Sequence, residues 1–300
     1  MNSAASPSTR ASAASAPHHA STTDEVLVPE ADLHCHILPD WDDGPRDLDE
    51  SLRMARRAAD SGIRRILVTP HVGRALRGPE KPSREIPAAT EWLAEKIREA
   101  GIPVELIPGA ELSLAAPELP ERVARHPWLT IGGQSQYILL ESPFPEWPDF
   151  GDKMLFQLSL KGVSIIIAHP ERYLNVQRDI GLIEKAVGQG ALLQITARSF
   201  LNPDNRPTYK TAMKMLERGM VSIIASDLHT DAGVQLADAV DKVVATVGKE
   251  EARRIFVHNP RRVLAGEYVP APDIRPAPVK KTFFSALMSR FAKKPTFYAQ

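Results

Sequence analysis

The chain has 300 residues, of which 43% are hydrophobic and 25% charged, a composition typical of globular proteins with a sizeable core. Its 37 basic and 37 acidic residues balance, which disfavours wholesale binding to nucleic acid. The single cysteine, Cys35, excludes an internal disulfide framework and a cysteine-rich zinc site, and no apolar run approaches the roughly 20 residues of a membrane span.

The first residues differ in composition from the rest. Residues 1–28 are rich in Ala, Ser, Thr and Pro and lack the continuous apolar stretch of a secretory signal, so we expect a disordered N-terminal tail. Residues 29–268 are expected to form one folded domain. The lone cysteine is compatible with a reducing compartment, and we expect a cytoplasmic protein.

Short apolar runs alternate with longer amphipathic segments through this domain. The runs expected to be strands are, in chain order, 26–33 (interrupted by Pro29 and Glu30), 65–69, 104–108, 137–140, 163–168, 191–196 and 221–225. The clearest helices between them are expected at 47–61, 91–100, 204–218 and 237–247, each stopping at a glycine. Asp47 and Glu50 form a capping-box-like start for the first helix. Seven such units predict an α/β fold with a closed or nearly closed (βα) barrel, and a doubly wound sheet is the alternative.

Residues 269–300 are expected to combine a Pro-rich linker with a basic segment that starts at Lys280. The apolar residues of that segment would share one face of a helix; they are Phe283, Phe284, Leu287, Met288 and Phe291. An apolar face with a cationic rim favours peripheral contact with an anionic membrane. Packing of this helix on the domain is the alternative.

Acidic and imidazole side chains stand at the carboxyl ends of six of the seven runs. In order, they are His34 and His36, His71, Glu111, Glu141, His169, and Asp227 with His229. In (βα) barrels this end carries the active site, because the βα loops converge there. Eight such groups would repel one another or lack partners without cations. The pattern therefore predicts a metal centre for manganese, iron or zinc.

The local spacing supports the same interpretation. Residues two apart in a strand point to the same face, so His34 and His36 can bind one ion together. Cys35 lies between them and points to the other face, where we expect it to be packed. Asp42 and Asp43 follow in a turn and offer a further carboxylate.

Known nucleophile motifs are missing from the sequence. Trp41 stands six residues after Cys35, where a cysteine-based tyrosine phosphatase has arginine. There is also no Gly-x-Ser-x-Gly elbow and no Walker loop. A metal-activated water is the strong nucleophile that remains.

The segment 34–45, His-Cys-His-Ile-Leu-Pro-Asp-Trp-Asp-Asp-Gly-Pro, resembles the opening motif of the bacterial metal-dependent protein-tyrosine phosphatases associated with capsule and exopolysaccharide synthesis. These enzymes belong to the polymerase-and-histidinol-phosphatase (PHP) superfamily. Segments that resemble the later motifs follow in order: 69–71, 109–111, 168–173, 193–196, 225–229 and 258–260. The resemblance covers roughly residues 30–265.

The resemblance implies a distorted (βα)7 barrel of the PHP type with a three-metal cluster, usually of Mn²⁺, although Fe, Zn, Co or Mg are possible. The ligands that it implies are His34, His36, Glu111 and Asp227 for the first ion, Glu111, Glu141 and His169 for the second, and Asp43, His71 and His229 for the third. Glu111 would bridge two ions. Arg172, three residues after His169, would bind the phosphate.

The implied activity is hydrolysis of phosphotyrosine on a protein, in particular a membrane-associated bacterial tyrosine autokinase that regulates capsule synthesis. A hydroxide bridging two ions would attack phosphorus, while the ions and Arg172 neutralise the equatorial oxygens. A phenol leaves with a pKa near 10, so a strong general acid is less necessary; His229 or His71 could assist.

The chain departs from the family pattern in one place. The family often has Arg-Pro-Pro shortly after its Asp-x-His motif, and that arginine helps to bind phosphate, whereas residues 230–234 here read Thr-Asp-Ala-Gly-Val. Arg74, Arg178 and Arg198 are candidates to replace it.

Three other functions remain open. A PHP-type phosphatase of a small monoester such as histidinol phosphate would use the same ligands. A non-catalytic scaffold that binds the kinase would not require all nine ligand positions to be filled. A nuclease is disfavoured by the balanced charge and by the lack of a basic groove with interleaved aromatic residues. The pattern leaves the oligomeric state open.

Overall fold

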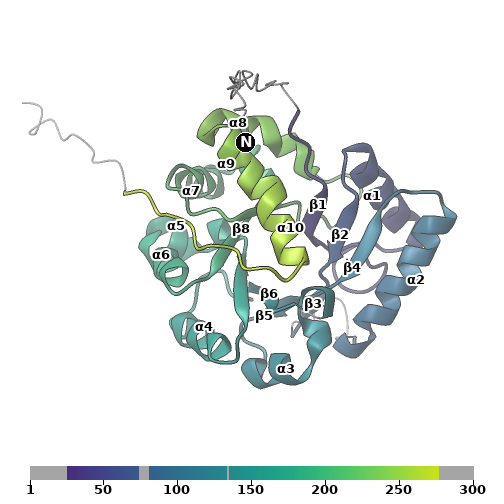
Figure 1. Ribbon diagram of the computed structural model, residues 1–300, viewed down its shortest axis with the longest axis horizontal. Coiled ribbons are helices and arrows are strands. Elements are labelled where there is room, and N and C mark those ends of the chain that lie inside the picture. Colours follow the sequence, from purple (N-terminus) through teal and green to yellow (C-terminus); the bar gives the residue numbers. More distant parts are fainter. Residues whose placement is uncertain (1–25, 74–80, 134, 277–300) are drawn as a thin grey trace, which may run out of the picture.

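The computed structural model describes residues 26–73, 81–133 and 135–276. Figure 1 shows a centre of strands with helices around it. Most of the expected N-terminal tail, Arg74 and the basic amphipathic C-terminal segment lie outside the described residues. Among the helices that are described, none is long and apolar enough to cross a membrane.

The strands, in chain order, are β1 (Ala31–Cys35), β2 (Arg65–Val68), β3 (His71–Val72), β4 (Glu105–Pro108), β5 (Glu111–Ser113), β6 (Tyr137–Glu141), β7 (Ser164–Ala168), β8 (Leu192–Thr196) and β9 (Ile223–Ala225). All pairs are parallel, in a sheet of order β1-β2-β4 and a sheet of order β3-β5-β6-β7-β8-β9. The first strand starts at Ala31, directly after Pro29 and Glu30, which interrupt the predicted run; Pro29 has no N–H to offer a neighbouring strand.

Two of the predicted runs continue from one sheet into the other. Thr69 and Pro70 separate β2 from β3, and Gly109 and Ala110 separate β4 from β5. Pro70 lacks an N–H, which interrupts the ladder, but its carbonyl still accepts a hydrogen bond from the Glu111 N–H at 3.1 Å. Seven strand units therefore account for the nine strands.

Backbone hydrogen bonds also join β1 to the segment after β9. The N–H of His36 donates to the Leu228 carbonyl at 2.9 Å, and the N–H of Asp227 donates to the His34 carbonyl at 2.8 Å. The first and last strand units thus lie side by side, at the level of the predicted ligands.

The α-helices are α1 (Leu48–Asp60), α2 (Ile86–Glu99), α3 (Leu119–Arg125), α4 (Gly151–Ser159), α5 (Leu174–Arg178), α6 (Gly181–Gly188), α7 (Arg206–Glu217), α8 (Val240–Val247), α9 (Lys249–Arg253) and α10 (Asn259–Leu264). Short helical turns are η1 (Ser83–Glu85), η2 (Pro127–Leu129), η3 (Ile131–Gly133), η4 (Pro170–Arg172), η5 (Ala197–Phe200), η6 (Leu236–Ala239) and η7 (Arg254–His258).

The first residues of α1 and α2 explain where these two helices begin. The Asp47 carboxylate accepts the Glu50 N–H at 2.8 Å, which confirms the predicted start of α1 and satisfies a donor at its first turn. In contrast, α2 begins at Ile86, earlier than predicted. Pro87 is tolerated there because the first turn of a helix needs no N–H from it.

The strands pack apolar side chains on both faces. On β6, Ile138 and Leu140 join the large core that the helices cover, whereas Tyr137 and Leu139 join a smaller core. This alternation follows from the two-residue period of a strand. Glu141 continues the face of Tyr137 and Leu139, so polar groups at the strand ends lie directly above the smaller core.

Candidate metal centre

The structure brings all nine predicted ligands together at the carboxyl ends of the strands. They form four overlapping groups, in each of which the ligand atoms lie within 4.8 Å of one another. The groups are His36, Asp43, His71 and His229; His34, His36 and Asp227; His34, Glu111 and His169; and His71, Glu111 and Glu141. This grouping differs in detail from the expected assignment, because His36 also lies beside Asp43, and Glu141 groups with His71 rather than with His169.

Glu111 is at the middle of the cluster. Its Oε2 lies 3.1 Å from His71 Nδ1 and 3.3 Å from both His34 Nε2 and His36 Nε2, and its Oε1 lies 2.8 Å from His169 Nε2. This buried carboxylate therefore contacts imidazoles from four different positions in the chain, as a bridging ligand would.

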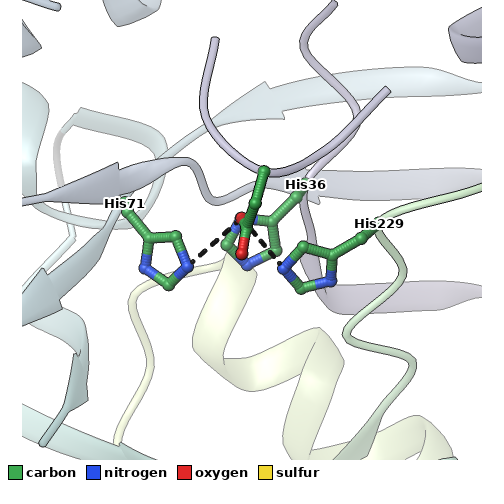
Figure 2. Close-up of side chains that lie close together, drawn as sticks. His36, His71 and His229 are labelled. Carbon is green, nitrogen blue, oxygen red and sulfur yellow. Dashed lines mark ion pairs between the residues drawn. The ribbon is translucent and has the colours of Figure 1, made fainter. Parts of the chain in front are cut away.

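A second carboxylate gathers three imidazoles near the cavity. Figure 2 shows His36, His71 and His229 around one carboxylate; Asp43 Oδ1 lies 3.5 Å from His71 Nε2 and 3.2 Å from His229 Nε2. The rings of His36 and His229 stack with their centroids 4.0 Å apart. These side chains come from three separate segments of the chain.

Two polar residues orient the first two imidazoles. Gln194 Oε1 lies 2.9 Å from His34 Nδ1, and Asp42 Oδ2 lies 2.8 Å from His36 Nδ1. Asp42 Oδ2 also accepts the backbone N–H of His71 at 2.9 Å. Partners of this kind hold the other ring nitrogen toward an ion. Sequence analysis assigned no such role to Asp42 or Gln194, although a glutamine inside an apolar run is a detectable signal.

A shift in β1 lets His34 face the cluster. The register of β1 against β2 changes between Asp32 and Cys35. The buried Asp32 Oδ1 accepts the N–H of Ser226 at 3.0 Å and that of His34 at 3.3 Å. Cys35 then packs in the large apolar core, on the face predicted for it.

Two of the candidate ligands have a left-handed backbone, which is unusual for residues other than glycine. His169 has φ 35° and Asp227 has φ 54°. Such conformations cost on the order of 1–3 kcal/mol each and persist where the surroundings enforce them. Here the N–H of His169 donates to the Gln194 carbonyl at 2.8 Å and that of Asp227 to the His34 carbonyl.

The charges of the cluster are strongly coupled. Burial lowers the pKa of His34, but the Glu111 and Asp227 carboxylates outweigh it and raise the pKa to about 9. Burial likewise opposes the Asp42 and Glu111 carboxylates at His36, whose pKa is raised well above its usual value. Burial raises the pKa of Glu111, yet the surrounding imidazoles hold it well below its usual range. When no ion is bound, protons on His34 and His36 thus offset part of the carboxylate charge.

The arrangement fits bound cations. The buried Glu111 Oε2 and His71 Nδ1 are 3.1 Å apart, yet neither has an aligned hydrogen bond within the described residues. A cation between such atoms would satisfy both. Imidazole and carboxylate donors without a thiolate suit manganese, iron or zinc.

Arg172 stands at the edge of the cluster. Its Nη2 donates to Asp227 Oδ2 at 2.5 Å and to Thr196 Oγ1 at 2.9 Å. Its side chain is 42% exposed and lines a cavity of about 1040 Å³ that opens over the cluster. The guanidinium is therefore fixed on one side and accessible on the other.

The lining of the cavity also distinguishes between the three arginines that could replace the phosphate-binding arginine of the family pattern. Arg198 lines it, and so does Val234, which marks the place of the departure from the family pattern. Arg178 is not among the lining residues and instead pairs with Glu146. Arg74 lies outside the described residues.

Parallel strands that end in a buried cluster of carboxylates and imidazoles, under an open cavity, define a protein of the metal-dependent hydrolase class. The chain belongs to the CpsB/CapC family of capsular polysaccharide synthesis, because the sequence model of this family matches residues 30–265. This finding confirms the resemblance seen in the motifs.

Individual relatives agree with the family. The tyrosine-protein phosphatase YwqE of Bacillus subtilis is 32% identical over 198 residues, which cover 66% of this chain and 76% of YwqE. The tyrosine-protein phosphatase CpsB of Streptococcus agalactiae is 28% identical over 249 residues, which cover 79% and 99%. A solved structure from work on YwqE of B. subtilis and CpsB of Streptococcus pneumoniae, described as unique metal-dependent tyrosine phosphatases, superposes with a TM-score of 0.76 at 27% identity, covering 83% of this chain and 99% of that one.

Proposed function

We propose that this chain is a metal-dependent protein-tyrosine phosphatase of capsule or exopolysaccharide synthesis. The observation that carries the proposal is the convergence of nine imidazole and carboxylate ligands, seven of which line one cavity together with Arg172. Relatives of the chain are named tyrosine-protein phosphatases. The folded unit is residues 29–268.

We further propose that the two sheets make one distorted (βα)7 barrel of the PHP type. Seven strand units support it, as do the backbone hydrogen bonds that join His34 and His36 to Asp227 and Leu228. A barrel places all strand ends, and hence all candidate ligands, around a single opening.

The nine residues would hold three ions, for which we propose Mn²⁺. Glu111 would bridge ions, because imidazoles from both sides reach its two oxygens. When bound, the ions supply Lewis acidity and a nucleophilic water near neutral pH.

The residues of the chain bind and orient the phosphate. Arg172 uses Nη2 for Asp227 and Thr196, so the remaining donors of its guanidinium can bind the phosphate oxygens as charge develops on them. Of the two candidate acids, the side chain of His229 is 29% exposed and that of His71 only 5%. His229 is thus the more accessible of the two to a leaving phenolate. Both also belong to the ligand set, and a ring nitrogen bound to an ion has no proton to give, so His229 would act as an acid only in a state in which it is not a ligand.

The size of the cavity favours a protein substrate. A volume of about 1040 Å³ lies just above the roughly 300–1,000 Å³ range of small-molecule sites. Phe144, which is 46% exposed, lines it and offers an apolar surface to an aromatic ring. Histidinol phosphate would leave much of this space unfilled.

We propose a membrane-associated bacterial tyrosine kinase as the substrate protein, met on the cytoplasmic side. The basic C-terminal segment would add peripheral contact with anionic lipid. Truncation after Pro276 tests this contact, because it spares the backbone hydrogen bond from Arg275 to Arg218. The truncated protein should keep its activity on a phosphopeptide but no longer sediment with anionic vesicles.

The decisive experiment compares kcat/KM of the Mn²⁺-loaded protein for a phosphotyrosyl peptide and for histidinol phosphate. We expect the peptide to be preferred at least about tenfold, because the open cavity can bind residues beside the phosphotyrosine. Faster hydrolysis of histidinol phosphate would identify a metabolite phosphatase instead. Tight binding of a phosphorylated kinase tail without any turnover would identify a scaffold.

A further inference from the structure

Away from the metal cluster, the cavity is lined by an apolar part and a polar part. Pro143, Phe144 and Pro145 make one part of it apolar. Another part is polar and comes from η5, the start of α7 and the segment between them; its residues are Arg198, Ser199, Asn202, Asn205, Thr208 and Tyr209. A phosphotyrosine side chain needs only the cluster and an apolar surface, so the polar part is available for other groups of a substrate.

Arg198 is the charged residue of this polar part. It is exposed and lines the cavity. Within the part of the chain that the structure describes, its side chain makes no hydrogen bond or ion pair. The carboxylates that line the cavity all belong to the metal cluster; they are Asp43, Glu111, Glu141 and Asp227. The charge of Arg198 is therefore uncompensated beside the cavity.

Nearby side chains add to the positive charge. Arg206 and Lys210 are exposed on α7, and Asp204 is the one acidic residue between positions 198 and 210. The Lys242 ammonium lies 5.7 Å from the ring centroid of Tyr209. Arg198 lines the cavity, and among residues 198–210 the basic side chains Arg198, Arg206 and Lys210 outnumber the one acidic side chain, Asp204; such a local surplus of positive charge attracts anionic groups.

The backbone that carries Arg198 is held to the turn that carries Arg172. Glu171 is fully buried, and its Oε1 accepts the Ser199 hydroxyl at 2.7 Å and the Thr196 N–H at 3.1 Å. Thr196 Oγ1 in turn accepts from Arg172. The two arginines therefore stand on connected, ordered turns, which lowers the entropic cost of binding one ligand through both.

We propose that Arg198 is a specificity residue that binds an acidic side chain near the phosphotyrosine of the substrate protein. The proposal rests on the proposed function, since it places the phosphotyrosine at the metal cluster. Arg172 binds the phosphate, Phe144 contacts the aromatic ring, and Arg198 pairs with a carboxylate a few residues away. An arginine–carboxylate pair is directional and charge-assisted, so an acidic neighbour is preferred over a neutral one.

The test uses two phosphotyrosyl peptides that differ only in flanking residues, Glu in one and Gln in the other. The full-length, Mn²⁺-loaded protein should show a kcat/KM that is about fivefold higher for the Glu peptide, the size expected of a partly exposed ion pair. In R198A the ratio of the two values should fall to about one, and in R198K part of it should remain. The R178A variant is the matched control, because Arg178 is an exposed arginine outside the lining, and its ratio should equal that of the unaltered protein.

The outcomes separate the inference from the proposed function. If R198A loses activity on both peptides and on free phosphotyrosine by the same factor, Arg198 contacts the phosphate and the inference is wrong. If the unaltered protein shows no preference for the Glu peptide, the inference is also wrong, although the phosphatase activity stands. If neither peptide is hydrolysed, the proposed function itself fails.

Discussion

The cavity has two regions that are built in contrasting ways. Its floor is formed by the metal-cluster residues that line it, and its wall is the polar part that contains Arg198. On the floor, buried imidazoles and carboxylates pair with one another; the side chains of His169 and Glu111 are 9% and 1% exposed. On the wall, Arg198 is exposed and has no side-chain partner within the described residues. The floor is made by strand ends, whose positions the sheets determine, and the wall by a turn and the start of a helix. Chemistry and substrate choice therefore depend on different parts of the molecule.

Removing the metal should have the largest effect, because it affects the floor as a whole. We expect EDTA to abolish phosphatase activity and added Mn²⁺ to restore it. C35S is the control and should keep its activity, since the Cys35 thiol packs in the apolar core and burial raises its pKa well above the usual value. Activity that survives chelation, or that is lost in C35S, would show that the mechanism is wrong.

Replacing Arg172 should have the next largest effect. R172A should lower kcat/KM by at least about 100-fold, because a charge-assisted contact that strengthens in the transition state is lost. R178A, which removes an exposed arginine outside the cavity lining, should change it little. Metal content, measured by elemental analysis, should stay the same in both. A loss of less than threefold in R172A would contradict the role.

Replacing Asp42 tests the support beneath the floor. D42N removes the carboxylate that holds His36 Nδ1, and such losses typically weaken metal affinity by about 10–100-fold. Activity should return at high Mn²⁺ concentration, which distinguishes weak binding from misfolding. D60N alters an exposed aspartate at the end of α1 and should leave metal affinity unchanged. Equal affinity in D42N and the unaltered protein would contradict the supporting role.

The smallest effect should be a pH dependence of the metal-free protein. The pKa of His34 is raised from 6.5 to about 9, so the folded state binds more protons than the unfolded state between these values. The resulting stability is fully present below about pH 6.5 and is lost as the pH rises through 9. Metal binding displaces these protons, so apparent Mn²⁺ affinity should rise over the same range. Denaturant unfolding in EDTA at pH 6, 7.5 and 9 measures the first effect; a free energy of unfolding that stays constant would contradict it.

The sequence alone identified the strand units and the residues at their ends. Parallel strands bring their carboxyl ends to one edge, so His71, Glu111 and His169 could be expected to meet without knowledge of any contact. The alternation within a strand likewise separated His34 and His36 from Cys35. These features depend on local patterns, which a linear sequence displays directly.

Only the tertiary structure decided which partners those residues have. Gln194 and Asp42 orient imidazoles from other positions in the chain, and the choice between Arg178 and Arg198 depends on which one reaches the cavity. Such contacts depend on the register of β1 and on the left-handed backbone at His169 and Asp227. Hydrogen bonds between distant segments enforce both features, and no local pattern in the sequence encodes those bonds.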